Sequence, residues 1–323
     1  MSNYLDETQL LYKNAATEPD VGLCCTTNPI WQLPELTIPN RMLQMNYGCG
    51  STVHPRDLVN NPKILYVGVG GGLELLQFAY FNRNRGAVVG VDSVDEMLNA
   101  CQENIIEAQR VNDWFESDYI NLVKGNALDL NLADQTIDVA AQNCLFNIFN
   151  SDDLDKALTE IYRVLKPKGR LVLSDPICEQ KMPQKLKDDD RLRAACLSGA
   201  IPLNEYLQRL VNIGFGTIEI RAKRPYRVLA SKKFDTLKNI TIESVEICAI
   251  KDPVPSDGPC VFTGRSAIYF GDEEFYDDKK GHVLFNNQPL SICDKTATML
   301  ESLNKNDIYV SPSDWNYDGG GCC

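Results

Sequence analysis

Cysteine is the residue type whose number and placement point most directly to chemistry. The chain has 323 residues with twelve cysteines but only two histidines, His54 and His282, which stand far apart. There is no Cys-x-x-Cys pair, so the ligand spacing of zinc ribbons and fingers is absent, and the chain is too long to need disulfides in place of a core. A thiol site is therefore expected to be assembled from distant segments, out of cysteines 24, 25, 49, 101, 144, 178, 196, 248, 260, 293, 322 and 323.

A glycine-rich loop is the second chemical signal. The run Gly-Val-Gly-Gly-Gly contains Gly68, Gly70 and Gly72, and it lies between a strand-like apolar segment and a helical one. Glycine allows a tight turn and the close approach of a ligand to a helix N-terminus. Asp92 ends the next predicted strand, where its carboxylate can accept hydrogen bonds from two ribose hydroxyls. This order of elements predicts a nucleoside-containing cofactor and leaves NAD and S-adenosylmethionine (SAM) open.

Hydrophobic patterning predicts the elements that position these residues. Strands alternate with helices, which is typical of a doubly wound, mostly parallel sheet. The expected strands are 63–67, 87–92, 121–124, 137–141, 170–174, 217–222 and 226–229; the expected helices are 73–81, one that starts at a Ser93–Glu96 capping box, 153–165 and 204–210.

The pattern predicts an α/β fold in four parts. Residues 1–58 read as helices and loops that contribute site cysteines, and residues 59–230 as the cofactor-binding domain. Residues 231–315 read as a small α+β domain, and residues 316–323 as a flexible Gly/Cys tail. In the third part we expect strands around 241–250, 260–270 and 282–286 and a helix around 294–303.

Composition argues against several kinds of partner. The net charge is −12, and no basic run is interleaved with aromatic residues, so nucleic acid is not an expected partner. No stretch approaches the roughly 18 consecutive apolar residues of a membrane span, and the first residues do not resemble an export signal. We therefore expect a cytoplasmic protein that does not associate with membranes, and we expect it to be a monomer.

The region after the glycine loop resembles class I SAM-dependent methyltransferases, which have a Rossmann-like fold. The resemblance rests on Asn143 and Cys144 at the end of the fourth strand and on Glu-Ile-Tyr-Arg-Val-Leu-Lys-Pro-Lys-Gly-Arg-Leu-Val-Leu-Ser-Asp at 160–175. Tyr66 departs from it, because the family usually has an acidic residue there. The resemblance implies that SAM is the cofactor, held by Gly68, Gly70 and Gly72 at its methionine end, by Asp92 at the ribose, by Asn126 and Ala127 at the adenine, and also by Asn143.

Within that class, the chain is most similar to arsenite methyltransferases of the bacterial and cyanobacterial type, over about residues 20–230. The segments that carry the similarity are Leu-Cys-Cys-Thr-Thr (23–27), Tyr-Gly-Cys-Gly-Ser (47–51), Asn-Cys-Leu-Phe-Asn (143–147), Ala-Cys-Leu-Ser-Gly-Ala (195–200) and Pro-Tyr-Arg (225–227). Two residues depart from the pattern: Ala195 stands in place of a frequent acidic residue, and Arg193 in place of a common tryptophan.

The resemblance implies a mechanism. Cys49, Cys144 and Cys196 would bind trivalent arsenic, supplied as arsenite or as an arsenic–thiol conjugate, so that its lone pair takes the methyl group of SAM. Cys24 or Cys25 would then form a disulfide with Cys49 as the arsenic is reduced, and thioredoxin or glutathione would restore the thiols. No general base is needed, because the nucleophile carries no proton.

The cysteines also have a structural interpretation, since buried cysteine packs as a small apolar residue. Cys144 lies at a strand end, where ligands bind in this fold, and Cys49 and Cys196 have small neighbours, so these three are favoured as ligands. Two interpretations of the tail pair Cys322 and Cys323 stay open: the pair captures arsenic, or it is an inert end of the chain. The remaining cysteines are expected to pack structurally: Cys101, Cys178, Cys248, Cys260 and Cys293.

Two other functions remain open at this point. The first is a class I methyltransferase for another small molecule, such as a quinone precursor. The second is a non-catalytic protein that binds soft metals on a methyltransferase fold.

Overall fold

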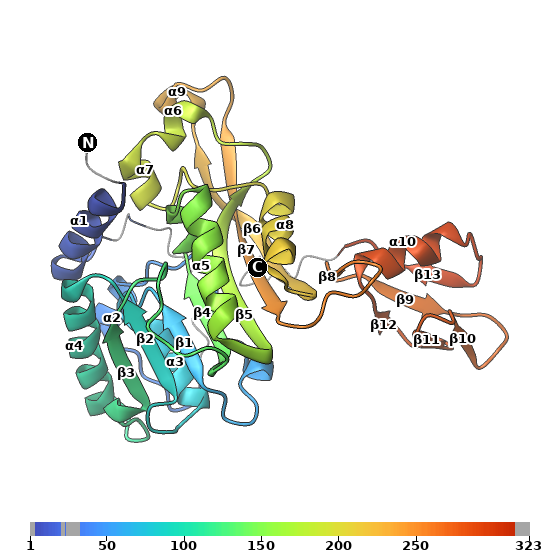
Figure 1. The fold of residues 1–323 in the computed structure, drawn as a ribbon, viewed down its shortest axis with the longest axis horizontal. Coiled ribbons are helices and arrows are strands. Elements are labelled where there is room, and N and C mark those ends of the chain that lie inside the picture. The colour runs from blue at the N-terminus through green and yellow to red at the C-terminus, as the bar shows by residue number, and fades with distance from the viewer. Residues whose placement is uncertain (1–3, 21–22, 24–32, 314–323) are drawn as a thin grey trace.

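The computed structural model describes residues 4–20, 23 and 33–313 and is built around one eight-stranded sheet (Figure 1). The strand order is β3-β2-β1-β4-β5-β7-β6-β8, and all neighbours run parallel except that β7 is antiparallel to both β5 and β6. The strands are β1 (Ile64–Val67), β2 (Val88–Asp92), β3 (Ile120–Lys124), β4 (Ile137–Asn143), β5 (Leu165–Cys178), β6 (Thr217–Leu229), β7 (Ile240–Ile250) and β8 (Cys260–Phe262). The expected doubly wound, mostly parallel sheet is confirmed.

Helices cover both faces of this sheet, which explains why its central strands read as continuous apolar runs. One face packs against α2 (Asn40–Gln44), α3 (Leu73–Phe81) and α4 (Asp95–Val111), and the other against α5 (Ser151–Val164) and α8 (Leu203–Ile213). In β1, Ile64 faces the first layer and Leu65 the second. Helix α5 begins after Asn150, whose side chain accepts a hydrogen bond from the Asp153 amide at 2.9 Å.

Short elements complete the main body. Helix α1 (Tyr4–Thr17) packs against α4 and against α7 (Asp190–Ala194). The other short elements are α6 (Gln184–Lys187), α9 (Ser231–Phe234) and the 3₁₀ turns η1 (Pro55–Asp57), η2 (Ser117–Tyr119) and η3 (Phe146–Ile148).

A small lobe projects from the β8 side of the main body (Figure 1). It contains a three-stranded sheet of order β12-β9-β13, a two-stranded sheet of β10 and β11, and helix α10. Their bounds are β9 (Ser266–Tyr269), β10 (Phe275–Asp277), β11 (Val283–Phe285), β12 (Leu290–Ser291), α10 (Asp294–Ser302) and β13 (Ile308–Val310). The lobe has its own apolar core around Ala267, Leu284 and Leu300, and the expected small α+β unit is confirmed.

The structure differs from the expected elements in several places. The single strand expected around 260–270 is divided between β8 of the main sheet and β9 of the lobe. Strand β7, which the sequence analysis groups with the C-terminal unit, pairs with β5 and β6 inside the main sheet. The two strands expected at 217–222 and 226–229 form one strand, β6, interrupted by register shifts. The Ser93 capping box does not form, because α4 begins after Val94 and no side chain caps it. The four-part division of the chain stays a proposal.

No helix within the described ranges is both long enough and apolar enough to cross a membrane.

A buried ion cluster ties η1 to the far half of the sheet. Both carboxylate oxygens of Asp57 accept hydrogen bonds from Arg221 on β6, and one of them also accepts from Arg170 on β5 at 2.8 Å. Burial alone would raise the pKa of Asp57, but its bonds to Arg221 and Arg170 hold that pKa below the ordinary value. The ionised form of Asp57 therefore stabilises the fold.

We expect Asp57→Asn to lower the free energy of unfolding by about 3 kcal/mol at neutral pH, because it leaves buried guanidinium charge uncompensated. Urea unfolding measures this change. Asp118→Asn removes an exposed partner of Arg85 and should change stability by less than about 1 kcal/mol. Because the folded-state pKa is depressed, the contribution of Asp57 is present near neutral pH and is lost as the pH falls through that pKa. Equal stability of the two variants at pH 7 would contradict this account.

Candidate active site

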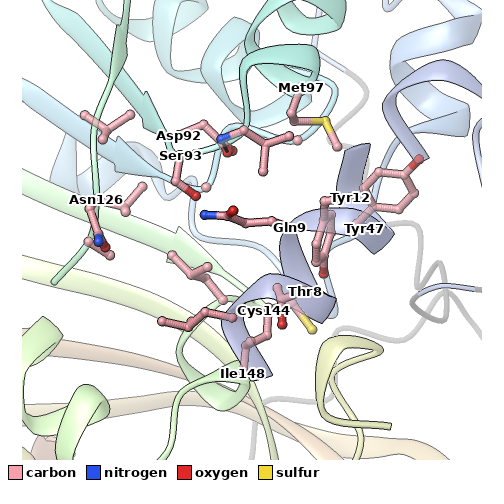
Figure 2. A pocket seen from close by; sticks show the side chains of 18 of the residues that line it. Thr8, Gln9, Tyr12, Tyr47, Asp92, Ser93, Met97, Asn126, Cys144 and Ile148 are labelled. Carbon is pink, nitrogen blue, oxygen red and sulfur yellow. Dashed lines mark hydrogen bonds between the residues drawn. The ribbon is translucent and has the colours of Figure 1, made fainter. Parts of the chain in front are cut away.

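A pocket opens at the carboxyl ends of β1, β2 and β4, with α1 running across it (Figure 2). It contains about 940 Å³ of empty space, including its open mouth. Six of the seven residues expected to bind the cofactor line it: Gly68, Gly70, Asp92, Asn126, Ala127 and Asn143. Cys144 lines the same pocket.

The seventh expected cofactor residue, Gly72, has a different local role. It is in the left-handed backbone region, at φ 87°, and immediately precedes α3. A Cβ at this position would lie 2.8 Å from the Sγ of Cys101 on α4. Gly72 therefore allows α3 and α4 to pack closely behind the loop, while Gly68 and Gly70 form the pocket wall.

Asp92 stands at the end of β2 and fixes the loop. Its carboxylate accepts hydrogen bonds from the backbone amides of Val69 and Val94, each at 3.0 Å. Burial raises the pKa of Asp92 to about 6, although these amide bonds act in the opposite direction. In Figure 2, Asp92 and Ser93 border one side of the pocket and Asn126 lies at its far end.

Cys144 follows β4 directly and adopts a left-handed backbone conformation with φ 62°, which is unusual for a residue other than glycine. Its amide donates to the carbonyl of Ser174 at 2.7 Å. The buried side chain of Gln142 accepts from the Leu145 amide at 2.8 Å and donates to Asp175 at 2.7 Å. These bonds hold the turn that brings Cys144 to the pocket.

Cys49 is fully buried in the loop that precedes β1. Its amide donates to Oδ1 of Asn143 at 2.9 Å, and its Sγ lies 3.4 Å from Oγ of Ser174. The neighbouring glycines permit this packing, because a Cβ on Gly48 would lie 2.5 Å from Asn143 and one on Gly50 would lie 2.3 Å from Ser174.

Cys196 follows α7 and is also in the left-handed region, at φ 59°. Its Sγ lies 2.9 Å from the carbonyl oxygen of Cys144 and 3.6 Å from the hydroxyl of Tyr12 on α1. Asn147 donates to its carbonyl at 2.9 Å. Cys196 is therefore a direct neighbour of Cys144.

The segments that carry Cys49, Cys144 and Cys196 thus meet around the end of β4. Within the described residues, however, no group of three or more histidine, cysteine, aspartate or glutamate side chains is placed to hold a metal ion. Cys24, Cys25, Cys322 and Cys323 lie outside the described residues.

Arg193, which departs from the family pattern, joins α7 to the turn after β4. Its guanidinium donates to the carbonyls of Ile148 at 3.3 Å and Phe149 at 3.1 Å, and it lies 5.5 Å from the ring centre of Tyr4 on α1. This arginine therefore ties together three of the segments that surround the pocket.

Glu74 on α3 is a site residue that sequence reasoning missed. Its buried carboxylate accepts from the hydroxyl of Tyr66 at 2.6 Å, from the amide and hydroxyl of Thr52 at 2.8 and 2.9 Å, and from Asn143 at 3.2 Å. Burial raises the pKa of Glu74, and these hydrogen bonds oppose the rise. Glu74 supplies an acidic group beside Tyr66, where the family's acidic residue is missing.

Helix α1 contributes pocket residues that were also missed. Leu5, Thr8, Gln9 and Tyr12 line the pocket, and Figure 2 shows Gln9 pointing into it. Their spacing of i, i+3, i+4 and i+7 places them on one helical face, which is the signal in the sequence that could have found them.

Three of the cysteines expected to be structural are buried and weakly acidic. Burial raises the pKa of Cys178 to about 11 and that of Cys248 to about 12, and it raises the pKa of Cys101 further. These side chains stay protonated at neutral pH and pack as small apolar groups.

Named relatives match much of the chain. It is 29% identical over 293 residues to an arsenite methyltransferase from Aquipseudomonas alcaligenes, a match that covers 86% of this chain and 81% of that protein. It is 26% identical over 179 residues to an arsenite methyltransferase from Halobacterium salinarum, which covers 55% of this chain and 44% of that one. The resemblance drawn from the cysteine segments is confirmed.

A solved structure shares the fold. The crystal structure of an arsenic(III) S-adenosylmethionine methyltransferase from Chlamydomonas reinhardtii aligns with a TM-score of 0.60 at 21% identity. The alignment covers 88% of this chain and 95% of that one, so the similarity in fold extends beyond the cofactor-binding part.

The loop after Cys196 provides a sharp test of the site's packing. A Cβ on Gly199 would lie 1.6 Å from the backbone oxygen of Asn147, which is itself buried. We expect Gly199→Ala to destabilise the protein by about 3 kcal/mol or more, because backbone must move to make room. Gly86→Ala is the control, because an added Cβ there would meet no neighbouring atom within 4 Å. Its only cost is the left-handed backbone conformation of Gly86, about 1–2 kcal/mol for a residue with a Cβ. Thermal unfolding compares the two, and a smaller loss for Gly199→Ala would contradict the packing.

The family model described as a methyltransferase domain matches residues 58–237, which include the glycine loop, Asp92, Cys144 and Cys196. The expected Rossmann-like class I methyltransferase fold, with its small C-terminal unit, is confirmed by this match and by the shared fold. The chain belongs to the methyltransferase domain family.

Proposed function

We propose that this protein methylates trivalent arsenic with SAM, and that Cys49, Cys144 and Cys196 bind the arsenic as substrate. The observation that carries the proposal is the position of Cys144, which lines the same pocket as the glycine loop and Asp92. A sulfur ligand at that wall lies next to the space that a nucleoside cofactor fills. The names of the matched relatives support the choice of arsenic.

The pocket fits SAM. Gly68 and Gly70 let the backbone approach the ligand, the Asp92 carboxylate can accept from ribose hydroxyls, and Asn126 with Ala127 borders the adenine end. SAM supplies an electrophilic methyl group on a sulfonium. The chain supplies the position of the two reactants, which can lower the barrier by several kcal/mol.

Soft thiolates hold trivalent arsenic better than carboxylate or imidazole does, and three of them leave its lone pair available for methyl transfer. Cys196 lies beside Cys144, and the loop of Cys49 is bonded to Asn143, which immediately precedes Cys144. We propose that arsenic binding draws the three sulfurs together, since no group of three such ligands within the described residues is already placed to hold an ion.

Methyl transfer leaves arsenic pentavalent, so the cycle needs two electrons. We propose that Cys24 or Cys25 pairs with Cys49 in a disulfide as the arsenic returns to the trivalent state, and that thioredoxin or glutathione then reduces the disulfide. We also propose that the protein acts as a monomer in the cytoplasm.

The cysteine assignment is tested by arsenite methylation with purified protein, SAM and a thiol reductant. We expect Cys144→Ser and Cys196→Ser each to lower methylarsenical formation at least about tenfold, because loss of even a group that only orients a metal ligand costs about 10- to 100-fold. Cys248→Ser, a buried strand cysteine, is the matched control and should keep activity. Unchanged product formation in either site variant would overturn the assignment.

The same assay, combined with calorimetry of SAM binding, separates the alternatives. A methyltransferase for a quinone precursor would bind SAM but leave arsenite unmethylated, and a non-catalytic soft-metal binder would not bind SAM.

Protonation of Asp92 should weaken cofactor binding at low pH. The raised pKa, about 6, means that the ribose acceptor is lost as the pH falls below that value. If only the ionised form binds, the Kd for SAM rises about tenfold from pH 7 to pH 5 in calorimetry. Asp92→Asn should bind SAM weakly with little change over this range. The same pH dependence in that variant would assign the titration to another group.

A further inference from the structure

Two cysteines outside the pocket lie against each other where the main sheet joins the C-terminal lobe. Cys260 begins β8, and Cys293 immediately precedes α10. Both are reduced. Their segments meet because α10 packs on β8, and the hydroxyl of Thr263, directly after β8, donates to Oδ1 of Asp294, directly after Cys293, at 2.6 Å. This contact brings the two thiols close enough to interact. Cys293 is buried, with 3% of its surface exposed, whereas Cys260 is only partly buried. The pair can therefore be approached from the Cys260 side.

A lysine flanks this cysteine pair. Lys295 Nζ donates to Asp257 Oδ1 at 2.6 Å and to the carbonyl of Gly258 at 2.7 Å, and it also hydrogen-bonds to Cys260. Its charge acts on both sulfurs. Burial and the neighbouring Cys293 raise the pKa of the Cys260 thiol, and Lys295 opposes that rise. Soft ions bind thiolate sulfur, and their binding releases the thiol protons.

A chain of polar contacts leads away from Cys293 on the other side. Its Sγ lies 3.3 Å from the hydroxyl of Thr296, and that hydroxyl lies 3.3 Å from Nε2 of His282. Nδ1 of His282 lies 2.6 Å from the carboxylate of Asp278. The pair is thus joined through Thr296 to an imidazole that a carboxylate holds in place.

The geometry points to a second site for a trivalent soft metalloid, in which Cys260 and Cys293 bridge one arsenic atom. With arsenous acid, two As–S bonds form and two As–O bonds break. The two thiol protons leave with the two hydroxyl groups as water, and one hydroxyl stays on arsenic. No atom changes oxidation state, so the step needs no electron acceptor, whereas a disulfide between the same cysteines would need one.

This site is separate from the pocket. Strand β8 forms the edge of the main sheet at the end opposite β3, and the lobe lies beyond it (Figure 1). An arsenic atom there would join α10 of the lobe to β8 of the sheet. It would stabilise that junction and would not be methylated. The inference rests on the proposed function for the choice of arsenic, but not on methyl transfer.

The test uses phenylarsine oxide, a probe that bridges two nearby thiols with loss of one water, added to the full-length reduced protein without SAM. Intact-mass measurement should show one phenylarsenic group fewer in Cys260→Ser and in Cys293→Ser than in the wild type. Cys248→Ser, whose sulfur is buried in β7, should match the wild type. Peptide mapping of the wild type should find one arsenic linking the peptides that contain Cys260 and Cys293.

Serine is a favoured residue immediately before a helix, so the Cys293→Ser variant should retain α10. If that variant loses α10, phenylarsenic uptake by Cys260→Ser tests the second site instead. The two variants should keep the wild-type rate of arsenite methylation. Equal phenylarsenic uptake in Cys260→Ser and the wild type, or an arsenic that links neither peptide, would overturn the second site. Loss of methylation in Cys144→Ser with normal uptake at Cys260 and Cys293 would leave it intact, so the two proposals fail separately.

Discussion

The buried carboxylate of Glu74 is the interaction on which the geometry of the site depends. It receives hydrogen bonds from β1 through Tyr66, from the loop after Cys49 through Thr52, and from the end of β4 through Asn143. Asn143 in turn holds the amide of Cys49 and the carbonyl of Gly50. One carboxylate thus fixes the loop of Cys49 against the strand end that presents Cys144. Because it is buried, it must keep all of these partners, which constrains the loop to one position.

The fold could be predicted where its signals are local. Apolar runs and helical spacing place β1 to β4, α3 and α5 close to their observed bounds, whereas β5 extends beyond the expected 170–174 at both ends. The position of β7 could not be read in this way, because the pairing of β7 with β5 and β6 is a long-range contact that leaves no periodicity in the sequence. The start of α4 also differs from the prediction: the helix begins after Val94, whose amide donates to the Asp92 carboxylate, and no side chain caps it.

The site could be predicted in part for the same reason. In a parallel sheet the strand ends meet at one edge, so Asp92 and Cys144 were expected to be neighbours of the glycine loop, and both line one pocket with it. Glu74 was missed because a glutamate in a helix reads as solvent-exposed until the fold buries it. The sequence predicts Cys260 and Cys293 only as packing residues, because their segments come together through the tertiary packing of α10 on β8. Residue types and their local order thus predict where the pocket lies, whereas the residues that hold its walls in place are brought there by tertiary contacts.

The central claim is that three sulfurs bind one arsenic atom beside the SAM pocket. X-ray absorption at the arsenic edge tests it most directly, on the arsenite complex of a protein in which Cys260 and Cys293 are both replaced by serine. The account predicts three sulfur neighbours for arsenic, and two when Cys49, Cys144 or Cys196 is also replaced by serine. A coordination shell dominated by oxygen, or a sulfur count that none of these three replacements changes, would contradict it.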